Sequence, residues 1–210
     1  MVKRVLVIVA TLAFAFGILF TSVLRTAAVK YDFKGAAVMD ENTNILGEEA
    51  VSIDYALPFP GRILPDSFLW PLKAARDRVW LWITTSPTRR AELRLLFADK
   101  RLGSAKTLFE KGNPELGVTT LTKAEKYLEE ASIDEKKNRE DGINTDEFLK
   151  RLANASLKHY LVMQEIYEMS PEEAKPMIVQ SQDYAKIVYE DARTALLENG
   201  IDPPENPFEW

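Results

Sequence analysis

The sequence predicts an all-α protein, with an N-terminal transmembrane helix followed by an antiparallel helical bundle of about five helices. Three observations predict this fold class. The chain opens with a long apolar run without charge, capping residues stand before prolines where several segments start, and glycines follow where they end. The predicted divisions are a signal anchor (1–28), an extended proline-containing linker (29–66), the helical bundle (67–199) and an extended proline-rich tail (200–210).

The composition is that of a folded, acidic protein. Of the 210 residues, 46% are hydrophobic and 28% charged, and the formal net charge is −5. An acidic chain is a poor ligand for nucleic-acid phosphates, and the lack of cysteine excludes disulfides, thiol nucleophiles and thiolate metal centres. No phosphate-binding or dinucleotide-binding fingerprint occurs. We therefore expect no nucleic-acid partner, no metal and no cofactor.

The apolar run at the N-terminus extends from Val5 to Leu24 and contains no charged residue. As a helix with a rise of about 1.5 Å per residue, it is long enough to span the hydrocarbon layer of roughly 30 Å. Lys3 and Arg4 precede it, which favours a cytoplasmic N-terminus and an extracytoplasmic C-terminal domain. We expect a single-pass membrane protein that contacts lipid through this span. The alternative is a signal peptide cleaved near residues 26–28.

The linker is predicted to be extended and to lie on the surface of the bundle. Pro58, Pro60 and Pro65 disfavour a helix through its second half. The apolar Leu57 and Phe59 stand among these prolines, whereas a flexible spacer would be richer in glycine and serine.

The linker runs into a motif that resembles a known family. The sequence from Leu64 to Asp77 reads LPDSFLWPLKAARD, and the similarity continues through residues 95–102 and 123–128. It resembles the LPDSPLYPLK-like signature of an uncharacterised bacterial domain, whose members often carry it after a single membrane span. The chain departs from that signature at Phe68, usually proline, and at Trp70, usually tyrosine. The resemblance implies a helical domain outside the cytoplasm, but it implies no activity.

Helix boundaries are marked by capping residues and glycines. The starts are Ser86-Pro87, Asn113-Pro114 and Ser170-Pro171, each a capping side chain followed by proline at the first helical position. The stops are Gly112, Gly142 and Gly200. The predicted helices cover residues 68–85, 87–111, 114–139, 145–169 and 171–199.

Each later helix carries small and apolar residues at spacings of three and four, which places them on one side, facing a core. The predicted core residues are Ala91, Leu95, Ala98, Leu102, Ala105, Phe109, Val118, Leu121, Ala124, Leu128, Ala131, Leu149, Leu152, Ser156, Tyr160, Met163, Tyr167, Ala174, Ile178, Ser181, Ala185, Val188, Ala192 and Ala195. Short turns between these helices predict antiparallel neighbours.

The titratable residues show no pattern that predicts a catalytic site. His159 is the only histidine, and we expect it to have a structural or surface role rather than to bind metal. Glu125 stands among Lys123, Lys126 and further acids, as on a solvated helix face. We therefore predict that the protein is not an enzyme and has no catalytic residues.

The aromatic residues supply candidates for an interaction surface. Trp82 shares one side of the first bundle helix with Val79, which favours a core position. Trp80 lies on another side and either rests on the membrane interface or is covered by neighbouring elements. The predicted interaction surface comprises Leu57, Phe59, Trp70, Trp80, Phe208 and Trp210, although the last two also suit packing back on the bundle.

The function predicted from these features is that of a membrane-anchored extracytoplasmic helical module that mediates protein–protein interaction in the cell envelope. One alternative is an accessory subunit of a larger membrane protein complex. A second alternative is an unrecognised carboxylate-dependent enzyme. The sequence does not identify the protein partner.

Overall fold

The computed structural model describes residues 52–208 and Trp210. The expected span from Val5 to Leu24 and the first part of the linker lie outside these residues. The described part is all-α and contains five helices and no strand, which confirms the predicted helical bundle. The helices are α2 (Trp70–Ile83), α3 (Pro87–Glu110), α4 (Pro114–Glu140), α5 (Asp146–Met169) and α6 (Lys175–Glu198). Among them, none has the length and apolar character needed to cross a bilayer.

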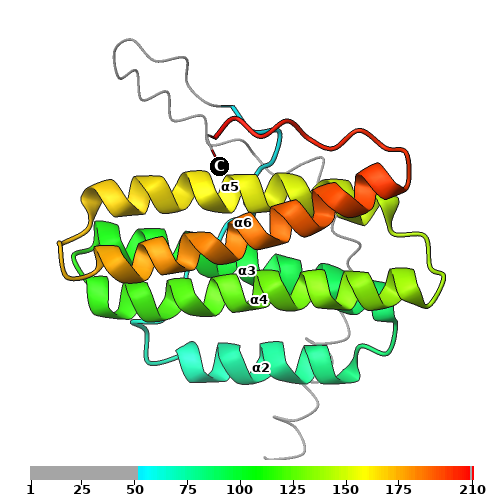
Figure 1. Cartoon of the computed structure of the whole chain (residues 1–210). Helices are drawn as coiled ribbons and strands as arrows, with labels where there is room; N and C mark the ends of the chain where they lie inside the picture. The colour runs from blue at the N-terminus through cyan, green and yellow to red at the C-terminus, as the bar shows by residue number, and fades with distance from the viewer. Residues whose placement is uncertain (1–51, 209) are drawn as a thin grey trace, which may run out of the picture.

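The helices form three layers (Figure 1). The antiparallel pair α3–α4 lies in the middle, α5 and α6 cover one side of it, and α2 lies alone on the other side. The tail after α6 runs back along the α5–α6 layer, on the side of the molecule opposite α2.

The capping signals act locally as predicted. The side chains of Ser86 and Asn113 accept hydrogen bonds from the backbone N–H groups of Arg89 and Leu116, three residues on. Helix α4 ends at Gly142, whose φ of 79° is favourable only for a residue without a side chain.

The last helix starts later than predicted. Residues 171–174 form a turn, and α6 begins at Lys175 rather than at Pro171. The reason is Pro176, which lacks a backbone N–H and would break a helix that had already made its first turn. A start at Lys175 places this proline in the first turn, where no N–H is needed.

The main core lies between the α3–α4 and α5–α6 layers. The predicted core positions are buried, apart from the half-buried Val118, Tyr160 and Tyr167. Leu102, Leu121, Leu128, Leu152 and Ile178 have no measurable exposure. Helix α3 also buries Leu93, Leu96 and Phe97 toward α2, because it alone is covered on two sides.

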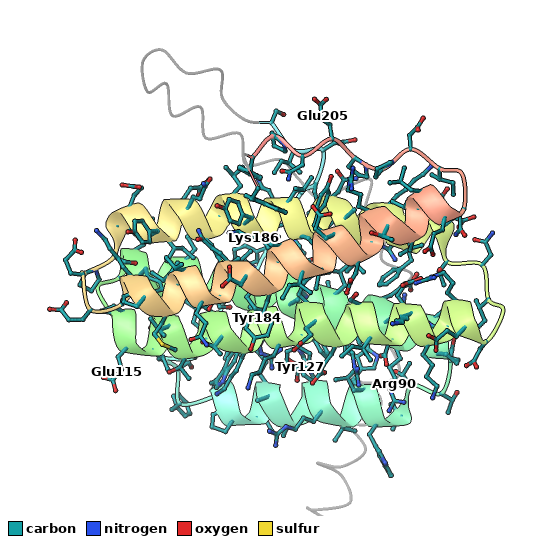
Figure 2. All side chains as sticks on the ribbon, viewed as in Figure 1. Arg90, Glu115, Tyr127, Tyr184, Lys186 and Glu205 are labelled. Atoms are coloured by element: carbon teal, nitrogen blue, oxygen red, sulfur yellow. The ribbon has the colours of Figure 1, made fainter. Side chains whose placement is uncertain are left out.

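Helix α2 packs with the face opposite to the one expected. Trp80 is 4% exposed and meets the Phe97 ring edge to face at 6.0 Å, and Phe97 meets Tyr127 in the same way at 5.9 Å. Figure 2 shows Tyr127 of α4 directed toward α2. Trp82 is 81% exposed, so its predicted core position is wrong. The membrane-interface reading of Trp80 fails for the same reason, since α3 covers its ring.

The tail is fixed to α5 and α6 by aromatic contacts. The Trp210 ring lies 5.3 Å from that of Tyr160 and 5.5 Å from that of Tyr189, and Phe208 lies 4.7 Å from Tyr160. The Tyr189 hydroxyl donates a 2.7 Å hydrogen bond to the carbonyl of Pro204. Both Phe208 and Trp210 therefore pack back on the bundle.

Candidate functional site

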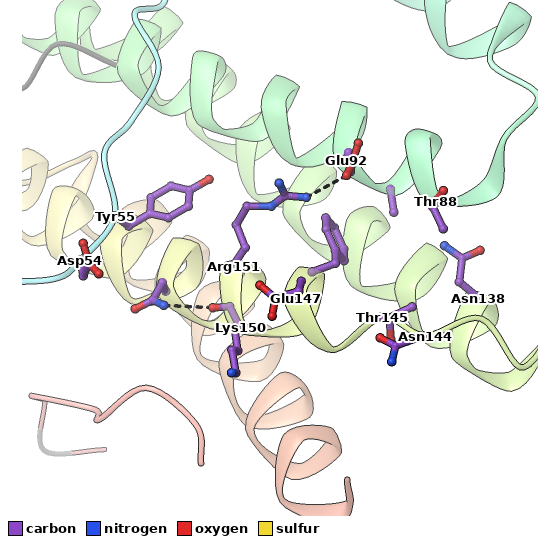
Figure 3. A pocket seen from close by; sticks show the side chains of 13 residues that line it. Asp54, Tyr55, Thr88, Glu92, Asn138, Asn144, Thr145, Glu147, Lys150 and Arg151 are labelled. Carbon is purple, nitrogen blue, oxygen red and sulfur yellow. Dashed lines mark hydrogen bonds and ion pairs between the residues drawn. The ribbon is translucent and has the colours of Figure 1, made fainter. Parts of the chain in front are cut away.

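A pocket of about 510 Å³ opens at the end of the bundle where α4 passes into α5 (Figure 3). The start of α3, the end of α4, the start of α5 and the extended segment around Tyr55 build its walls. Its volume lies within the range of small-ligand and peptide sites. The lining residues are Asp54, Tyr55, Thr88, Ala91, Glu92, Asn138, Asn144, Thr145, Glu147, Phe148, Lys150, Arg151 and Asn154.

The charges in the pocket are largely paired across helices. Arg151 of α5 contacts Glu92 of α3 at 3.2 Å, and Arg89 contacts the other oxygen of Glu92 at 3.1 Å. The guanidinium of Arg151 also lies over the ring of Phe148, 5.1 Å from its centroid. These contacts neutralise Glu92 and hold its wall of the pocket. Glu147 and Lys150 are exposed at the rim and give it one charge of each sign.

Asn138 lines the pocket from the last turns of α4. Asn138 as a whole is only 3% exposed, yet its side chain makes no hydrogen bond with any residue in the described part of the chain. The carboxamide is not fully enclosed and opens onto the pocket, where water or a ligand supplies its hydrogen bonds. The carboxamide has N–H donors and a carbonyl acceptor, which match the acceptor and the donor of a peptide group.

The turn beside Asn138 is held by its own polar contacts. The Thr145 hydroxyl donates to buried Glu135 at 2.6 Å, and Arg139 donates to the same carboxylate oxygen at 3.2 Å. The amide of Asn199 donates to Asp146 at 2.8 Å and thereby joins the end of α6 to the start of α5. The pocket therefore has a fixed wall on this side.

Tyr55 connects the pocket to a polar cluster within the core. Its hydroxyl donates a 2.7 Å hydrogen bond to Asp99 of α3. Asp99 lies 3.0 Å from Nε2 of His159 on α5, and Nδ1 of His159 lies 2.8 Å from Glu125 on α4. The side chains of Asp99, His159 and Glu125 have no exposure. We call these four residues the buried polar cluster.

His159 carries a proton on each ring nitrogen, because both nitrogens face carboxylate oxygens. Burial disfavours the imidazolium and by itself lowers the pKa of His159. The attraction of Glu125 and the hydrogen bonds to Asp99 and Glu125 outweigh burial and raise the pKa to about 10. Burial and the charge of Asp99 raise the pKa of Tyr55, which keeps its hydroxyl a donor.

The buried polar cluster has a structural role. His159 has no solvent exposure, its two carboxylate partners lie on α3 and α4, and Tyr55 reaches Asp99 from the extended segment. The expectation of a structural or surface role is thereby resolved in favour of the structural one. The expected solvated position of Glu125 is wrong, because that carboxylate is fully buried against His159.

The sequence contains a weak signal for this cluster. Asp99 stands beside Ala98 and Leu102, and Glu125 stands beside Ala124 and Leu128, all of which belong to the predicted core stripes. An acid next to a core stripe needs a buried cation, and His159 is bordered by the buried Ala155 and Val162. The pairing across α3, α4 and α5 required the tertiary structure.

The signature motif fastens the linker to the bundle. The ammonium of Lys73 donates hydrogen bonds to the carbonyls of Pro60 at 3.0 Å and Ile63 at 2.9 Å, and it lies 4.9 Å from the centre of the Trp70 ring. Burial lowers the pKa of Lys73. Asp66 pairs with Lys111 at 3.1 Å. The motif thus acts as a clamp between the extended segment, α2 and α3.

The predicted interaction surface is dispersed in the structure. Leu57 is half-buried against the main core, and Trp70 is half-buried beneath Lys73. Trp80 is buried, and Phe59 is exposed on the linker. With Phe208 and Trp210 packed on α5 and α6, these residues form no common patch. None of the six lines the pocket.

The pocket lining combines polar and apolar side chains. Among the residues that the structure describes, no group of three or more histidine, cysteine or acidic side chains is placed to hold a metal ion. The pocket instead combines amide, hydroxyl and charged groups with the apolar Ala91 and Phe148. Such a lining offers donors and acceptors together with some apolar contact.

The fold and the pocket define a helical-bundle domain with a polar pocket at one end. A family model described as Domain of unknown function (DUF5667) matches residues 62–173, which is more than half of the chain, and the chain belongs to this family. The match covers α2 to α5 and ends before α6. Comparisons with curated proteins and with solved structures found no match.

Proposed function

We propose that this protein is a membrane-anchored, extracytoplasmic and non-catalytic module whose pocket binds an extended segment of a partner protein in the cell envelope. The apolar run from Val5 to Leu24 supplies the anchor, and the basic Lys3 and Arg4 support the export of the helical domain.

The observation that carries the proposal is the carboxamide of Asn138. It lies in the pocket wall, opens onto the pocket and makes no hydrogen bond with the described residues. A backbone peptide group offers the donor and the acceptor that this carboxamide needs. Lys150 and Glu147 at the rim suit side chains of both signs on the bound segment.

The test is purification of the tagged full-length protein from its native membranes in mild detergent, with mass spectrometry of the proteins that co-elute. We expect a stoichiometric companion with the unmodified chain. Substitution Asn138→Ala should lower its recovery about tenfold or more, as for a central interface residue. It should leave the melting temperature nearly unchanged, because the Asn138 side chain makes no hydrogen bond with the described residues.

A rim variant and a matched control complete the experiment. Lys150→Glu should also release the companion, whereas Lys123→Glu, an equal charge reversal at an exposed site on α4 outside the pocket, should retain it. If the companion is recovered equally with all three variants, the pocket is not the contact. If no companion co-elutes with the unmodified chain, the proposal is wrong.

A further inference from the structure

We propose that the outward face of α2 lies on the surface of an anionic phospholipid bilayer and thereby orients the bundle against the membrane. The proposal rests on the anchoring part of the proposed function. It concerns α2 and the lipid, whereas the pocket and its protein partner lie elsewhere on the bundle.

The outward face of α2 is apolar, against the usual rule for a surface helix. Leu72, Ala75, Val79 and Trp82 recur at spacings of three and four, which places them on one side of the helix, and Phe68 continues the pattern in the turn before it. All five are exposed, and Ile83 extends the face. We call these six residues the α2 stripe.

The inward face of α2 is the more polar one. It carries Lys73, Asp77 and Trp80, and Asp77 is buried with Arg76 at 2.7 Å. Since α2 contacts α3 alone among the helices, its other side has no cover within the described structure. A helix that turns its apolar stripe away from its own domain has the pattern of an interfacial helix.

The charges around the α2 stripe complement a negatively charged surface. At 100° per residue, Arg78 borders the stripe and is exposed, so its long side chain can reach lipid headgroups, whereas Arg76 on the other border is paired with Asp77. Residues 62–90 contain six basic and two acidic residues, in a chain whose net charge is −5. Three of the six are held elsewhere, because Lys73 faces inward and Arg76 and Arg89 pair with carboxylates. The same charges disfavour pairing with a second copy, because the stripe of each copy would bring arginines together.

The N-terminal run brings the lipid within reach of α2. Between Leu24 and Ser52 the chain can extend at most about 100 Å, so an anchored bundle stays near the bilayer. A tethered contact acts at high effective concentration and can therefore be weak. The aromatic Trp82 and Phe68 suit the boundary between headgroups and acyl chains.

The test uses the full chain in vesicles and exploits its lack of cysteine. An environment-sensitive fluorophore is attached at one of two single cysteines, Leu72→Cys on the α2 stripe or Ile187→Cys on α6. The two sites are matched, because Leu72 is 57% exposed and Ile187 is 60% exposed. The labelled protein is reconstituted into vesicles containing phosphatidylglycerol. Quenching is measured with a lipid that carries a spin label near its headgroup, and with iodide in the buffer.

We expect the fluorophore at position 72 to be quenched by the lipid and protected from iodide, and the one at position 187 to show the reverse. Adding Arg78→Gln should lower the ratio of docked to undocked protein about fivefold, because one basic residue near the surface is lost. Raising the salt concentration or using zwitterionic lipid should also weaken docking.

Three outcomes would overturn the proposal and are distinguishable from one another. Lipid quenching that is equal at positions 72 and 187 would mean that α2 does not face the bilayer. Protection at position 72 from both quenchers would mean that a protein covers the α2 stripe. A chain that fails to float with the vesicles would lack the anchor itself, which also refutes the proposed function, whereas the first two outcomes leave the anchor intact.

Discussion

His159 joins three helices through a single side chain. Its two ring nitrogens contact Asp99 of α3 and Glu125 of α4, while Tyr55 brings the extended segment to the same point. Buried charges of this kind rarely add net stability over an apolar core, but the loss of one partner is strongly destabilising. The buried polar cluster therefore makes one alignment of α3, α4 and α5 far more favourable than its alternatives.

The first prediction concerns removal of the imidazolium. Substitution His159→Leu should lower the free energy of unfolding by about 3–5 kcal/mol, because two buried carboxylates lose their cation. Denaturant unfolding followed by circular dichroism measures the change, and His159→Gln serves if the leucine variant does not fold. Glu165→Gln, which breaks the exposed pair with Lys106, should change stability by less than about 1 kcal/mol. Equal effects at both positions would contradict the structural role of His159.

The second prediction concerns pH. The pKa of His159 is about 10 in the folded protein and near 6.5 when the chain unfolds. Between these values the folded state binds more protons, so stability must fall as pH rises, by about 1.4 kcal/mol per pH unit at most. The contribution is complete below pH 6.5 and lost above about pH 10.

Unfolding measured from pH 6 to 10 tests this sign. Lys73 and Lys100, whose pKa values burial lowers, oppose the trend at high pH, so the informative quantity is the difference between the parent and His159→Gln. That difference should shrink as pH rises. A constant difference would show that His159 is not charged in the folded protein.

Among the helices, α3 and α4 approach closely because a glycine lies between them. At Gly117, near the start of α4, an added methyl group would stand 2.7 Å from the ring of Phe109. The ring is buried and cannot move away. At Gly103 of α3, by contrast, the nearest atoms belong to Pro60 of the linker at 3.4 Å, an ordinary contact distance.

The third prediction compares these two glycines. Both lie within helices, where alanine is favoured over glycine by about 1 kcal/mol. Gly103→Ala should therefore be neutral or stabilising, whereas Gly117→Ala should destabilise the protein by about 1–2 kcal/mol because overpacking outweighs the helix propensity. Melting temperatures of the two variants measure the contrast. A higher melting temperature for Gly117→Ala would contradict the close approach of the two helices.

On the scale of the whole molecule, the two ends of the described chain each pack against one of the outer helix layers. The linker is held to α2 and α3 by Lys73, and the tail is held to α5 and α6 by Phe208 and Trp210. The pocket lies at one end of the bundle, and the α2 stripe lies on the side facing away from α5 and α6. A bilayer against α2 would thus leave the α5–α6 layer turned away from the membrane.

The fourth prediction tests the fastening of the tail. Trp210→Ala removes contacts with Tyr160 and Tyr189, and since the indole is half-buried we expect a loss of about 2 kcal/mol, below that of a fully buried tryptophan. Phe59→Ala, at an exposed aromatic residue of the linker, should change stability by less than about 0.5 kcal/mol. Thermal unfolding followed by circular dichroism distinguishes the two. No loss in Trp210→Ala would mean that the tail contacts contribute nothing in solution.

The local signals predicted most of the bundle, and they failed where a distant contact decided the outcome. Capping at Ser86 and Asn113 and the stop at Gly142 depend on neighbouring residues only, so these boundaries agree with the structure. The start of α6 was misplaced, although Pro176 was visible in the sequence. The pocket was not predicted, because its walls come from four separate segments.

The sequence by itself determined the helices, their core stripes and the family, because each depends on local propensity, periodicity or a contiguous motif. Only the tertiary structure decided which side of α2 faces the protein. The stripe containing Trp82 has the periodicity of a core face, yet α3 receives Trp80 and Asp77 instead. Likewise, His159 finds its two carboxylates on other helices. Periodicity shows that residues share a face, whereas the element that covers this face is chosen by packing across the whole molecule.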